Sequence, residues 1–378
     1  MTSSPDIKTK PGGPSRVKRW KKILLVIAIS LLSLEIVLQI LAYLSPLNFL
    51  PHNLDRYWET RFLREYPLRG KETGMTVTHE TRGWTVQSGY SSEGGGLMYT
   101  INDMGYRSPR KVHEESEDKF RVMVLGNSFT FGWDCDDRTT WPQTLENLDP
   151  RLQVINLGVG GYGIDQMLVT LRESIRVFKP QLVIVAFIGD NLFRSLLSFR
   201  DYKKPLFILE NDELILTNIP IGTREETYRS LQDKTYPPRL MLWVLARKAY
   251  NRLFKSDADI LFPSPQAEIL CEELNTRLLL EMIEVAREHK AEILFVHLAW
   301  GKAIRDKSYE CYGEEFLNRF VEVHNVPHAT TRESFLKGSG WTKGHYQEKE
   351  AGLVAECVYE RLNRIPAWRD YAFRNLKN

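Results

Sequence analysis

The sequence predicts an α/β fold, a three-layer sandwich in which helices cover both faces of a parallel β-sheet, preceded by one transmembrane helix. Three observations lead to this prediction. Short apolar runs rich in β-branched residues lie within 121–125, 152–163 and 181–191, and each ends in a polar or glycine-rich turn. Helical patterns separate these runs, as they do in repeated β-α-β units. A long apolar stretch near the N-terminus is sufficient to cross a bilayer.

Residues 1–22 form a basic tail. They contain seven Lys and Arg residues and one acidic residue, Asp6, so the tail carries +6 in a chain whose formal net charge is +3. The rest of the chain is therefore slightly acidic. Because the positive charge is confined to the tail, the composition predicts no nucleic-acid partner.

Residues 23–44 are predicted to be a transmembrane signal anchor. Ile23 to Leu44 comprises 22 mostly apolar residues without glycine or proline, enough for a helix that spans ~30 Å of hydrocarbon. A cleaved signal peptide has an apolar region of ~7–15 residues and a small-residue cleavage site, and neither is present. The positive-inside rule then predicts a single-pass protein with a cytoplasmic N-terminus. Its main domain would be extracytoplasmic, in the periplasm if the cell is Gram-negative.

Two polar residues interrupt the anchor. Glu35 and Gln39 are four residues apart and so lie on one face of the predicted helix. Intramembrane carboxylates commonly contact a partner, so one interpretation is a second membrane helix. The other is a protonated or snorkelling Glu35 in a solitary anchor, and the sequence does not decide between them.

The remaining chain divides into three parts. Residues 45–115 are predicted to be an extracytoplasmic extension with a small β-meander, because strand-like pieces alternate there with glycines. Residues 116–365 form the main domain, with an insertion at about 195–262 that includes a β-hairpin turning at Asn211 and Asp212. Residues 366–378 are predicted to be a C-terminal tail.

Ser128 is the first candidate functional residue. It follows the strand at 121–125, and ligands of open α/β sheets bind beyond the carboxyl ends of strands. A serine that opens a helix is often only an N-cap. Three further features favour catalysis: a glycine-rich loop after the second strand, Asn191 after the third, and a distal His345 before a C-terminal helix. These are the parts of acyl transfer by an activated serine.

The motifs GNSFTFG (126–132) and VINLGVGGYGIDQ (154–166), with the later Gly189-Asp190-Asn191 and His345, resemble the SGNH or GDSL hydrolase superfamily of the membrane-anchored type. The resemblance implies a flavodoxin-like sheet, Ser128 as nucleophile and His345 as base. It also implies an oxyanion hole built from Ser128 N–H, Gly161 and Asn191. The third motif exchanges amide and carboxylate relative to the family's Gly-Asn-Asp, and an ionised Asp190 cannot donate to an oxyanion.

The family's third triad residue is missing from its usual place. It is normally an Asp two or three residues before the histidine, where this chain has Lys343 and Thr342. Three outcomes remain open: a backbone carbonyl orients His345 in a Ser–His dyad, a distant acidic residue replaces the Asp, or the site is degenerate. In a serine-protease triad, replacing the Asp by an amide costs ~10⁴ in kcat.

The leading functional expectation is a serine esterase or O-acyltransferase that removes or transfers acetyl groups on a cell-envelope or exported polysaccharide. A lipid esterase or thioesterase is the alternative enzyme, since the anchor would hold the site near the bilayer. The alternative without catalysis is an SGNH-like glycan-binding or assembly subunit. An α/β-hydrolase elbow would require glycine two residues after the nucleophile, where Thr130 stands.

No cofactor and no metal site are predicted. His324 and His328 are four residues apart, but no third ligand accompanies them. The four cysteines allow three complete disulfide pairings. A bridge between Cys271 and Cys311 is the pairing that we expect.

Overall fold

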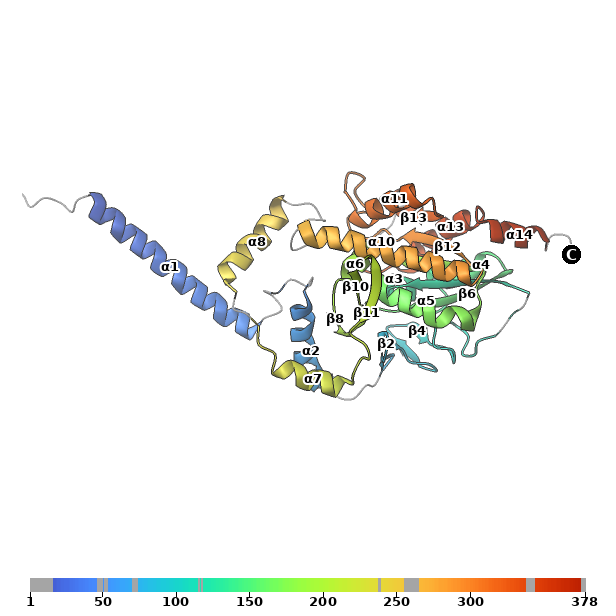
Figure 1. The fold of residues 1–378 in the computed structure, drawn as a ribbon, viewed down its shortest axis with the longest axis horizontal. Coiled ribbons are helices and arrows are strands. Elements are labelled where there is room, and N and C mark those ends of the chain that lie inside the picture. The colour runs from blue at the N-terminus through green and yellow to red at the C-terminus, as the bar shows by residue number, and fades with distance from the viewer. Residues whose placement is uncertain are drawn as a thin grey trace, which may run out of the picture. The chain divides into compact units, whose positions relative to one another are not determined.

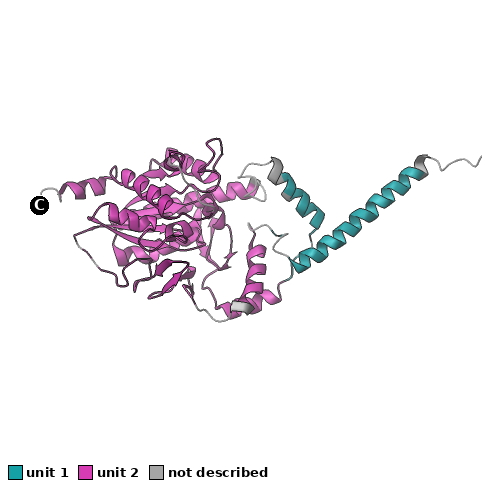
Figure 2. Cartoon of the chain, turned by 180° about the vertical axis from the view of Figure 1, so that it is seen from behind, with its two compact units in different colours: residues 1–50, 235–253 teal, residues 51–234, 254–378 magenta. Residues whose placement is uncertain are grey.

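The computed structural model describes residues 16–45, 50, 54–69, 74–114, 116, 118–236, 239–254, 265–337 and 344–374. The chain forms two compact units (Figure 2). Unit 1 comprises residues 1–50 and 235–253, and unit 2 comprises residues 51–234 and 254–378.

Figure 1 labels many of the helices and strands. The helices are α1 (Arg16–Leu44), α2 (Asp55–Arg69), α3 (Ser128–Phe131), α4 (Trp141–Leu148), α5 (Ile164–Phe178), α6 (Gly189–Arg194), α7 (Arg224–Gln232), α8 (Met241–Phe254), α10 (Pro265–Glu288), α11 (Tyr312–His324), α12 (Arg332–Lys337), α13 (Glu348–Leu362) and α14 (Pro366–Arg374). The strands are β1 (Thr76–His79), β2 (Gly83–Val86), β3 (Ser91–Gly94), β4 (Leu97–Thr100), β5 (Phe120–Gly126), β6 (Leu152–Gly158), β7 (Leu182–Phe187), β8 (Phe199–Arg200), β9 (Tyr202–Lys203), β10 (Leu206–Glu210), β11 (Glu213–Thr217), β12 (Glu292–His297) and β13 (His328–Thr330).

Unit 2 is built on a parallel sheet of five strands in the order β13-β12-β7-β5-β6. In chain order this is 2-1-3-4-5, the flavodoxin-like arrangement, whose ligand crevice lies between the first and third strands. Gly126 pairs with both Gly158 and Ala186, so β5, β6 and β7 end at the same level. The loops that follow these three strands therefore begin side by side.

Helices cover both faces of this sheet, which confirms the predicted three-layer α/β fold. Side chains of a strand alternate between its faces. Along β5, Met123 and Leu125 pack into the layer that includes α5, α10 and α11. Val122 and Val124 pack instead against α4, α13 and α14. Every residue of β5 from Val122 to Gly126 is buried, as its apolar composition predicts.

The part of the extension that follows residue 50 belongs to the same compact unit as the sheet. It forms two antiparallel strand pairs, β1 with β2 and β3 with β4, in place of one meander. Trp84 on β2 is 4% exposed and is part of the main apolar core. Arg107 forms an isolated β-bridge with Asn156 of β6. The predicted boundary near residue 115 therefore does not separate two compact bodies.

Two other predicted segments differ in the structure. The insertion contains the hairpin β10–β11, with Asn211 and Asp212 at positive φ in its turn, but residues 235–253 belong to unit 1. The predicted C-terminal tail is wrong for residues 366–374, which form α14. Trp368 of α14 is 1% exposed and packs edge-on against Phe120 of β5, so burial of an indole holds this helix on the domain.

All four cysteines are free in the structure, so the expected Cys271–Cys311 bridge is wrong. Cys271 is fully buried, and burial raises the pKa of its thiol to about 12. Cys311 Sγ lies 3.6 Å from His297 Nε2. Both side chains thus have other packing partners.

Arg107 connects the extension to the segment that follows β5. Its side chain is 0% exposed, and the side chain of its ion-pair partner Asp137 is 4% exposed. The guanidinium contacts one carboxylate and four backbone carbonyls: Nε donates to Asp137 Oδ1 (2.9 Å), and the terminal nitrogens donate to the carbonyl oxygens of Phe131 (3.0 Å), Gly132, Met98 (3.0 Å) and Cys135 (2.6 Å). A buried guanidinium that satisfies all these acceptors fixes the course of residues 131–137.

We predict that Arg107→Met lowers the free energy of unfolding of the detergent-solubilised chain by ~3–5 kcal/mol, because it leaves the buried Asp137 carboxylate unpaired. Denaturant unfolding measures the change. Arg138→Met is the matched control: it makes the same substitution at an exposed arginine of the same segment, where a surface change is worth about 0.5 kcal/mol or less. Equal effects of the two substitutions would contradict the role assigned to Arg107.

Candidate active site

Ser128 stands at a sharp turn between β5 and the short helix α3. Asn127 caps this helix, since its Oδ1 accepts a hydrogen bond from Phe129 N at 2.8 Å. One helical turn later Gly132 adopts φ +83°, and a β-carbon there would collide with Thr140. The chain therefore reverses at Gly132 and returns toward Ser128, with Trp133 N donating to Ser128 O at 3.1 Å.

His345 contacts Ser128 directly. Its Nε2 lies 2.7 Å from Ser128 Oγ, although 217 residues separate them in the sequence. The ring packs on Phe129, with centroids 4.7 Å apart. The next residue, Tyr346, is buried and its carbonyl oxygen accepts from Cys135 Sγ at 3.1 Å. The structure thus brings together the predicted nucleophile and base, on loops that are each held by buried neighbours.

A carboxylate lies on the other side of the His345 ring. Asp134 Oδ2 is 4.0 Å from His345 Nδ1, which is an ion-pair distance and longer than a hydrogen bond. The Asp134 side chain is 42% exposed. Of the three outcomes left open by the sequence, this geometry corresponds to a distant acidic residue. Sequence reasoning missed Asp134, because it lies six residues after the serine and not before the histidine.

Burial and nearby charges set the protonation of His345. Burial lowers the pKa of His345 below its usual value, Asp134 opposes this shift, and the positive charges of Arg194 and Arg200 add to it. The imidazole is therefore neutral at neutral pH. When Ser128 O–H donates to Nε2, the ring proton is on Nδ1, which faces Asp134. This is the tautomer that a general base needs.

The glycine-rich loop after β6 lies beside Ser128. A β-carbon built on Gly160 would be 4.0 Å from Ser128 Cβ. Gly161 has φ +90°, and a side chain there would collide with the Arg200 guanidinium, so only glycine fits. Neither Ser128 N–H nor Gly161 N–H donates to an acceptor within the described part of the chain. Both donors are available to a ligand.

Trp84 from the extension holds this loop. Its Nε1 donates to Gly160 O at 2.9 Å, and Tyr162 O–H donates in return to Trp84 O at 2.5 Å. Their rings meet edge-on, with centroids 5.7 Å apart. The extension therefore holds the loop that lies beside Ser128.

The structure does not place the Asn191 amide at an oxyanion position. Asn191 is 0% exposed, and its Nδ2 donates to Tyr162 O. Its Oδ1 accepts from Asn127 Nδ2 at 2.6 Å and from Ile188 N at 2.8 Å. All these partners belong to the fold, so Asn191 ties the turn before Ser128 to the glycine-rich loop.

The two further positions named from sequence have different outcomes. Asp190 forms an ion pair with Arg194 at 3.6 Å, and its side chain is 30% exposed. Thr342, like Lys343, lies outside the described residues. The positions of Arg194 and Arg200 near His345 could not be predicted from local pattern, because their approach depends on how the segment after α6 folds back.

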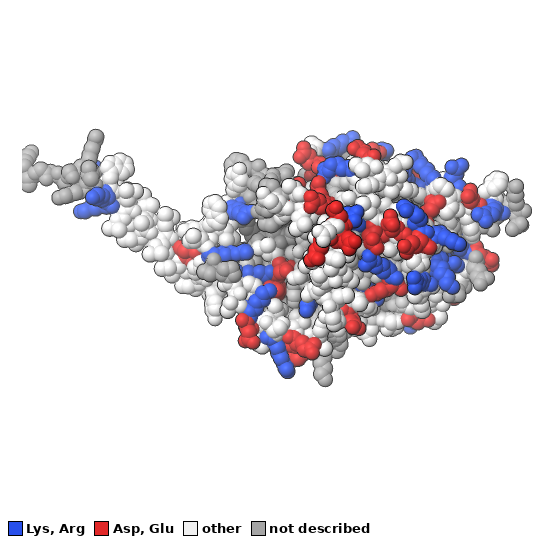
Figure 3. Space-filling view, viewed as in Figure 1, with Lys and Arg blue, Asp and Glu red and all other residues white. Residues whose placement is uncertain are grey.

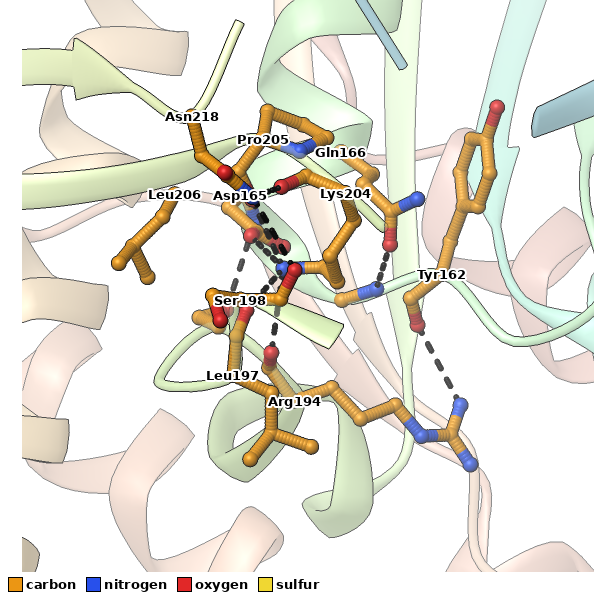
Figure 4. A network of polar contacts seen from close by, with 12 residues as sticks. Tyr162, Asp165, Gln166, Arg194, Leu197, Ser198, Lys204, Pro205, Leu206 and Asn218 are labelled. Carbon is orange, nitrogen blue, oxygen red and sulfur yellow. Dashed lines mark hydrogen bonds and ion pairs between the residues drawn. The ribbon is translucent and has the colours of Figure 1, made fainter. Parts of the chain in front are cut away.

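A buried ion pair lies next to the end of the glycine-rich loop (Figure 4). Lys204 Nζ donates to Asp165 Oδ2, and both side chains are 0% exposed. The ammonium also donates to Leu197 O at 2.9 Å and Pro205 O at 3.1 Å. Because Asp165 is in the first turn of α5, this pair joins the start of the insertion to the helix that follows the loop.

Two exposed indoles flank the Ser128 turn. Trp133 is 42% exposed, and its Cζ3 lies 3.6 Å from a β-carbon built on Gly160. Trp300 is 39% exposed and packs on Phe129, with ring centroids 5.8 Å apart. Exposed indoles are uncommon because they leave a large apolar face in water. Both rings therefore leave part of their apolar surface in water beside the Ser128 turn.

Within the described ranges, no group of three His, Cys, Asp or Glu side chains could hold a metal ion. His297, on β12, is fully buried, and burial lowers its pKa to about 4. It is a core histidine, as its place within a strand predicts.

No protein-family model and no curated protein matches the chain. Solved structures similar to it include a member of the lipolytic protein G-D-S-L family from Veillonella parvula DSM 2008 (13% identity, 65% of this chain and 99% of that chain, TM-score 0.36). A psychrotrophic esterase from Pseudoalteromonas sp. (10%, 65% and 98%, 0.37) is another. A third is a catalytic mutant of an acetylxylan esterase from Geobacillus stearothermophilus (11%, 66% and 96%, 0.36). These TM-scores are below 0.5, so the functional argument rests on the geometry of Ser128 and His345.

We predict that Asp134→Asn slows phosphonylation of Ser128 by a fluorophosphonate roughly tenfold to a hundredfold. This is less than the ~10⁴ of a buried triad Asp, because the carboxylate is half exposed and 4.0 Å away. Loss of its negative charge removes an influence that raises the pKa of His345. The acidic limb of the rate against pH should therefore move to lower pH while the plateau falls.

Asp136→Asn is the control for this measurement, since it makes the same change two residues on, in a carboxylate that accepts from Met98 N and Arg138 N. Its rate and pH profile should equal those of the wild type. An unchanged profile in Asp134→Asn would show that this carboxylate does not act on His345.

Proposed function

We propose that the chain is a membrane-anchored serine esterase or O-acyltransferase that acts through an acyl-serine intermediate. The observation that carries the proposal is the 2.7 Å contact between Ser128 Oγ and His345 Nε2. It lies at the ends of β5 and β7, where flavodoxin-like sheets bind ligands. The resemblance of the Ser128, Gly161 and His345 motifs to SGNH hydrolases points to the same chemistry.

In the first half-reaction, Ser128 Oγ bonds to the carbonyl carbon of an ester while its proton passes to His345 Nε2. The carbonyl oxygen becomes an oxyanion, which accepts from Ser128 N–H and Gly161 N–H. Collapse of this intermediate breaks the bond to the alcohol, which leaves with the proton from His345. Water or a sugar hydroxyl then attacks the acyl-serine by the same route in reverse.

Asn191 and Asp134 are positioning residues in this proposal. Asn191 holds the Ser128 turn against the glycine-rich loop through Asn127 and Tyr162. Asp134 orients the Nδ1 side of His345 and stabilises the imidazolium that forms during attack. Asp190, which is paired with Arg194, has no chemical step assigned.

The proposed substrate is an O-acetylated polysaccharide of the cell envelope or an exported one. The exposed indoles of Trp133 and Trp300 beside the Ser128 turn support this choice, since an indole face can stack on the apolar face of a sugar ring. A lipid esterase or thioesterase is the alternative, and chain length of the preferred acyl group separates the two.

The apolar helix α1 supports membrane anchoring. Residues 19–44 of it are long and apolar enough to cross a bilayer by length and composition. Figure 3 shows the middle of α1 without charged side chains. A cleaved signal sequence would share these properties. Retention is favoured because Glu35 of α1 accepts hydrogen bonds from Met241 and Leu242, within the same compact unit. The proposed topology places the basic tail in the cytoplasm and unit 2 outside.

We predict that a fluorophosphonate labels the full chain in detergent at Ser128, and that labelling is lost in Ser128→Ala and falls by ~10²–10⁴ in His345→Ala, the range expected of a general base. Ser91→Ala, at an exposed serine of β3, is the control and should label fully. A folded chain that stays unlabelled would favour the silent glycan-binding or assembly subunit instead.

Substrate class is tested next, with wild type and Ser128→Ala compared throughout. Release of acetate from acetylated xylan and from p-nitrophenyl acetate, but not of palmitate from its p-nitrophenyl ester, is expected. Preference for the long acyl chain would overturn the polysaccharide assignment and favour the lipid esterase. A hydroxyl acceptor that raises turnover without raising acetate release would identify a transferase.

A further inference from the structure

Glu35 interrupts the apolar face of α1, and its partner within the structure is a helix that lies about 200 residues later in the chain. Its Oε1 accepts from Met241 N at 2.8 Å and its Oε2 accepts from Leu242 N at 2.9 Å. Gln39 Nε2 donates to Arg239 O at 2.7 Å and to Glu35 Oε1 at 2.6 Å. The two polar residues of the anchor thus bind the beginning of α8.

The burial of side chains along α1 also indicates a contact with α8. From Arg19 to Leu44, where side chains are described, Glu35 and Leu38 are the residues classed as buried, at 9% and 8% exposure. Both lie on the side of α1 that meets α8. Apart from Ala42, which is partly buried, the other apolar residues between Arg19 and Leu44 are exposed in the structure, as they would be toward lipid.

The position of Glu35 in α1 fixes the depth of this contact. Glu35 stands nine residues before Leu44, the end of the helix, which is about 13 Å along the axis at ~1.5 Å per residue. Half of a hydrocarbon core is ~15 Å thick. If α1 spans the bilayer, the first turn of α8 therefore lies inside the outer leaflet.

The residues exposed on the first turns of α8 are apolar, as a position within the hydrocarbon core requires. Leu240 and Trp243 are 66% and 68% exposed, and Tyr250 is 54% exposed two turns later on the same side. The first six residues of α8, from Met241 to Ala246, carry no charge, and basic residues begin at Arg247. An apolar beginning followed by basic residues is typical of a segment that enters lipid from the headgroup side.

We propose that α8, together with Arg239 and Leu240 before it, is a second membrane-embedded element, which inserts the first turns of α8 into the acyl chains of the extracytoplasmic leaflet beside α1. This inference rests on the proposed anchoring of α1. The occupant of the exposed face of α8 is lipid. Arg239, at the level of Gln39, is close enough to the surface for its long side chain to reach the headgroups.

The Glu35 contact explains how a helix can begin inside lipid. The first N–H groups of a helix lack partners within the helix, and no water is present in the hydrocarbon core to bind them. The Glu35 carboxylate accepts two of these donors, and the positive end of the helix dipole stabilises its charge. The Glu35 carboxylate and the first N–H groups of α8 thus offset the free-energy cost of burying each other in lipid. The polar face of α1 and the start of α8 therefore depend on one another.

The experiment is lipid photolabelling of the full chain in phosphatidylcholine and phosphatidylglycerol nanodiscs, with a diazirine on the acyl chain. Labelled peptides are identified by mass spectrometry. We expect labels on α1 and on residues 240–246. Val323, an exposed apolar residue of α11, reports labelling outside lipid. Peptides 240–246 labelled no more than Val323, while α1 is labelled, would overturn the inference, whether that face is then covered by solvent or by another membrane protein.

Failure of the anchoring proposal would look different, since α1 itself would then remain unlabelled. Glu35→Ala tests the cap: labels on 240–246 should be lost while those on α1 persist. Glu35→Gln, which keeps one acceptor and the side-chain volume, should restore them in part. Equal labelling of 240–246 in wild type and Glu35→Ala would refute the role of Glu35. Thermal unfolding of each variant shows that unit 2 remains folded.

Discussion

The arrangement of the site depends on one buried guanidinium. Arg107 binds the backbone of residues 131–135 and the Asp137 carboxylate from within the extension. After β5 the chain makes a single helical turn and then reverses. Such a segment forms few hydrogen bonds within itself, and without Arg107 it would be mobile. Because Arg107 satisfies the carbonyls at this reversal, Trp133 and Asp134 are returned to the side of Ser128 and His345. The extension thus supports the candidate site physically, although it precedes the sheet in the chain.

The same logic applies to the other loops. Trp84, again from the extension, binds Gly160 O. Asn191 joins the turn before Ser128 to Tyr162, and the Lys204–Asp165 pair holds the start of α5. These three sets of hydrogen bonds fix the backbone that carries the Ser128 hydroxyl and the N–H groups of Ser128 and Gly161. Preorganisation of this kind is what oxyanion stabilisation requires, since donors that must reorient during the reaction lose much of their effect.

The sequence predicted the features that depend on local pattern. Helix α5 (Ile164–Phe178) is one of the helices predicted between the apolar strands, because its apolar face repeats at helical spacing. Ser128 and His345 were found from motifs, and the structure brings them together. Asp134 and the role of Asn191 could not be predicted, because both depend on which loop folds against which, and nothing in their own neighbourhood encodes it. The predicted tail at 366–374 failed for a similar reason: the short helix α14 is stabilised by Trp368 in the core and not by its own pattern.

Asp134 lies on the same segment as Ser128. The fold therefore has to position one distant residue at the site, His345, and not two. Ser128 and Asp134 belong to one reversal clamped by Arg107, so their separation is set locally. His345 alone must be brought in from the far end of the chain, and its neighbour Tyr346 does this through hydrogen bonds to Cys135 of the same reversal and Ala299 after β12.

The exposed position of Asp134 also has an electrostatic consequence. A carboxylate that is 42% exposed and 4.0 Å from the ring is screened by water and interacts more weakly than a buried one. Burial and two arginines already keep His345 neutral, so a stronger carboxylate is not needed to prepare the base. In the proposed mechanism its contribution falls in the step where the imidazolium forms, which is why loss of Asp134 should affect the plateau of the rate as well as its pH dependence.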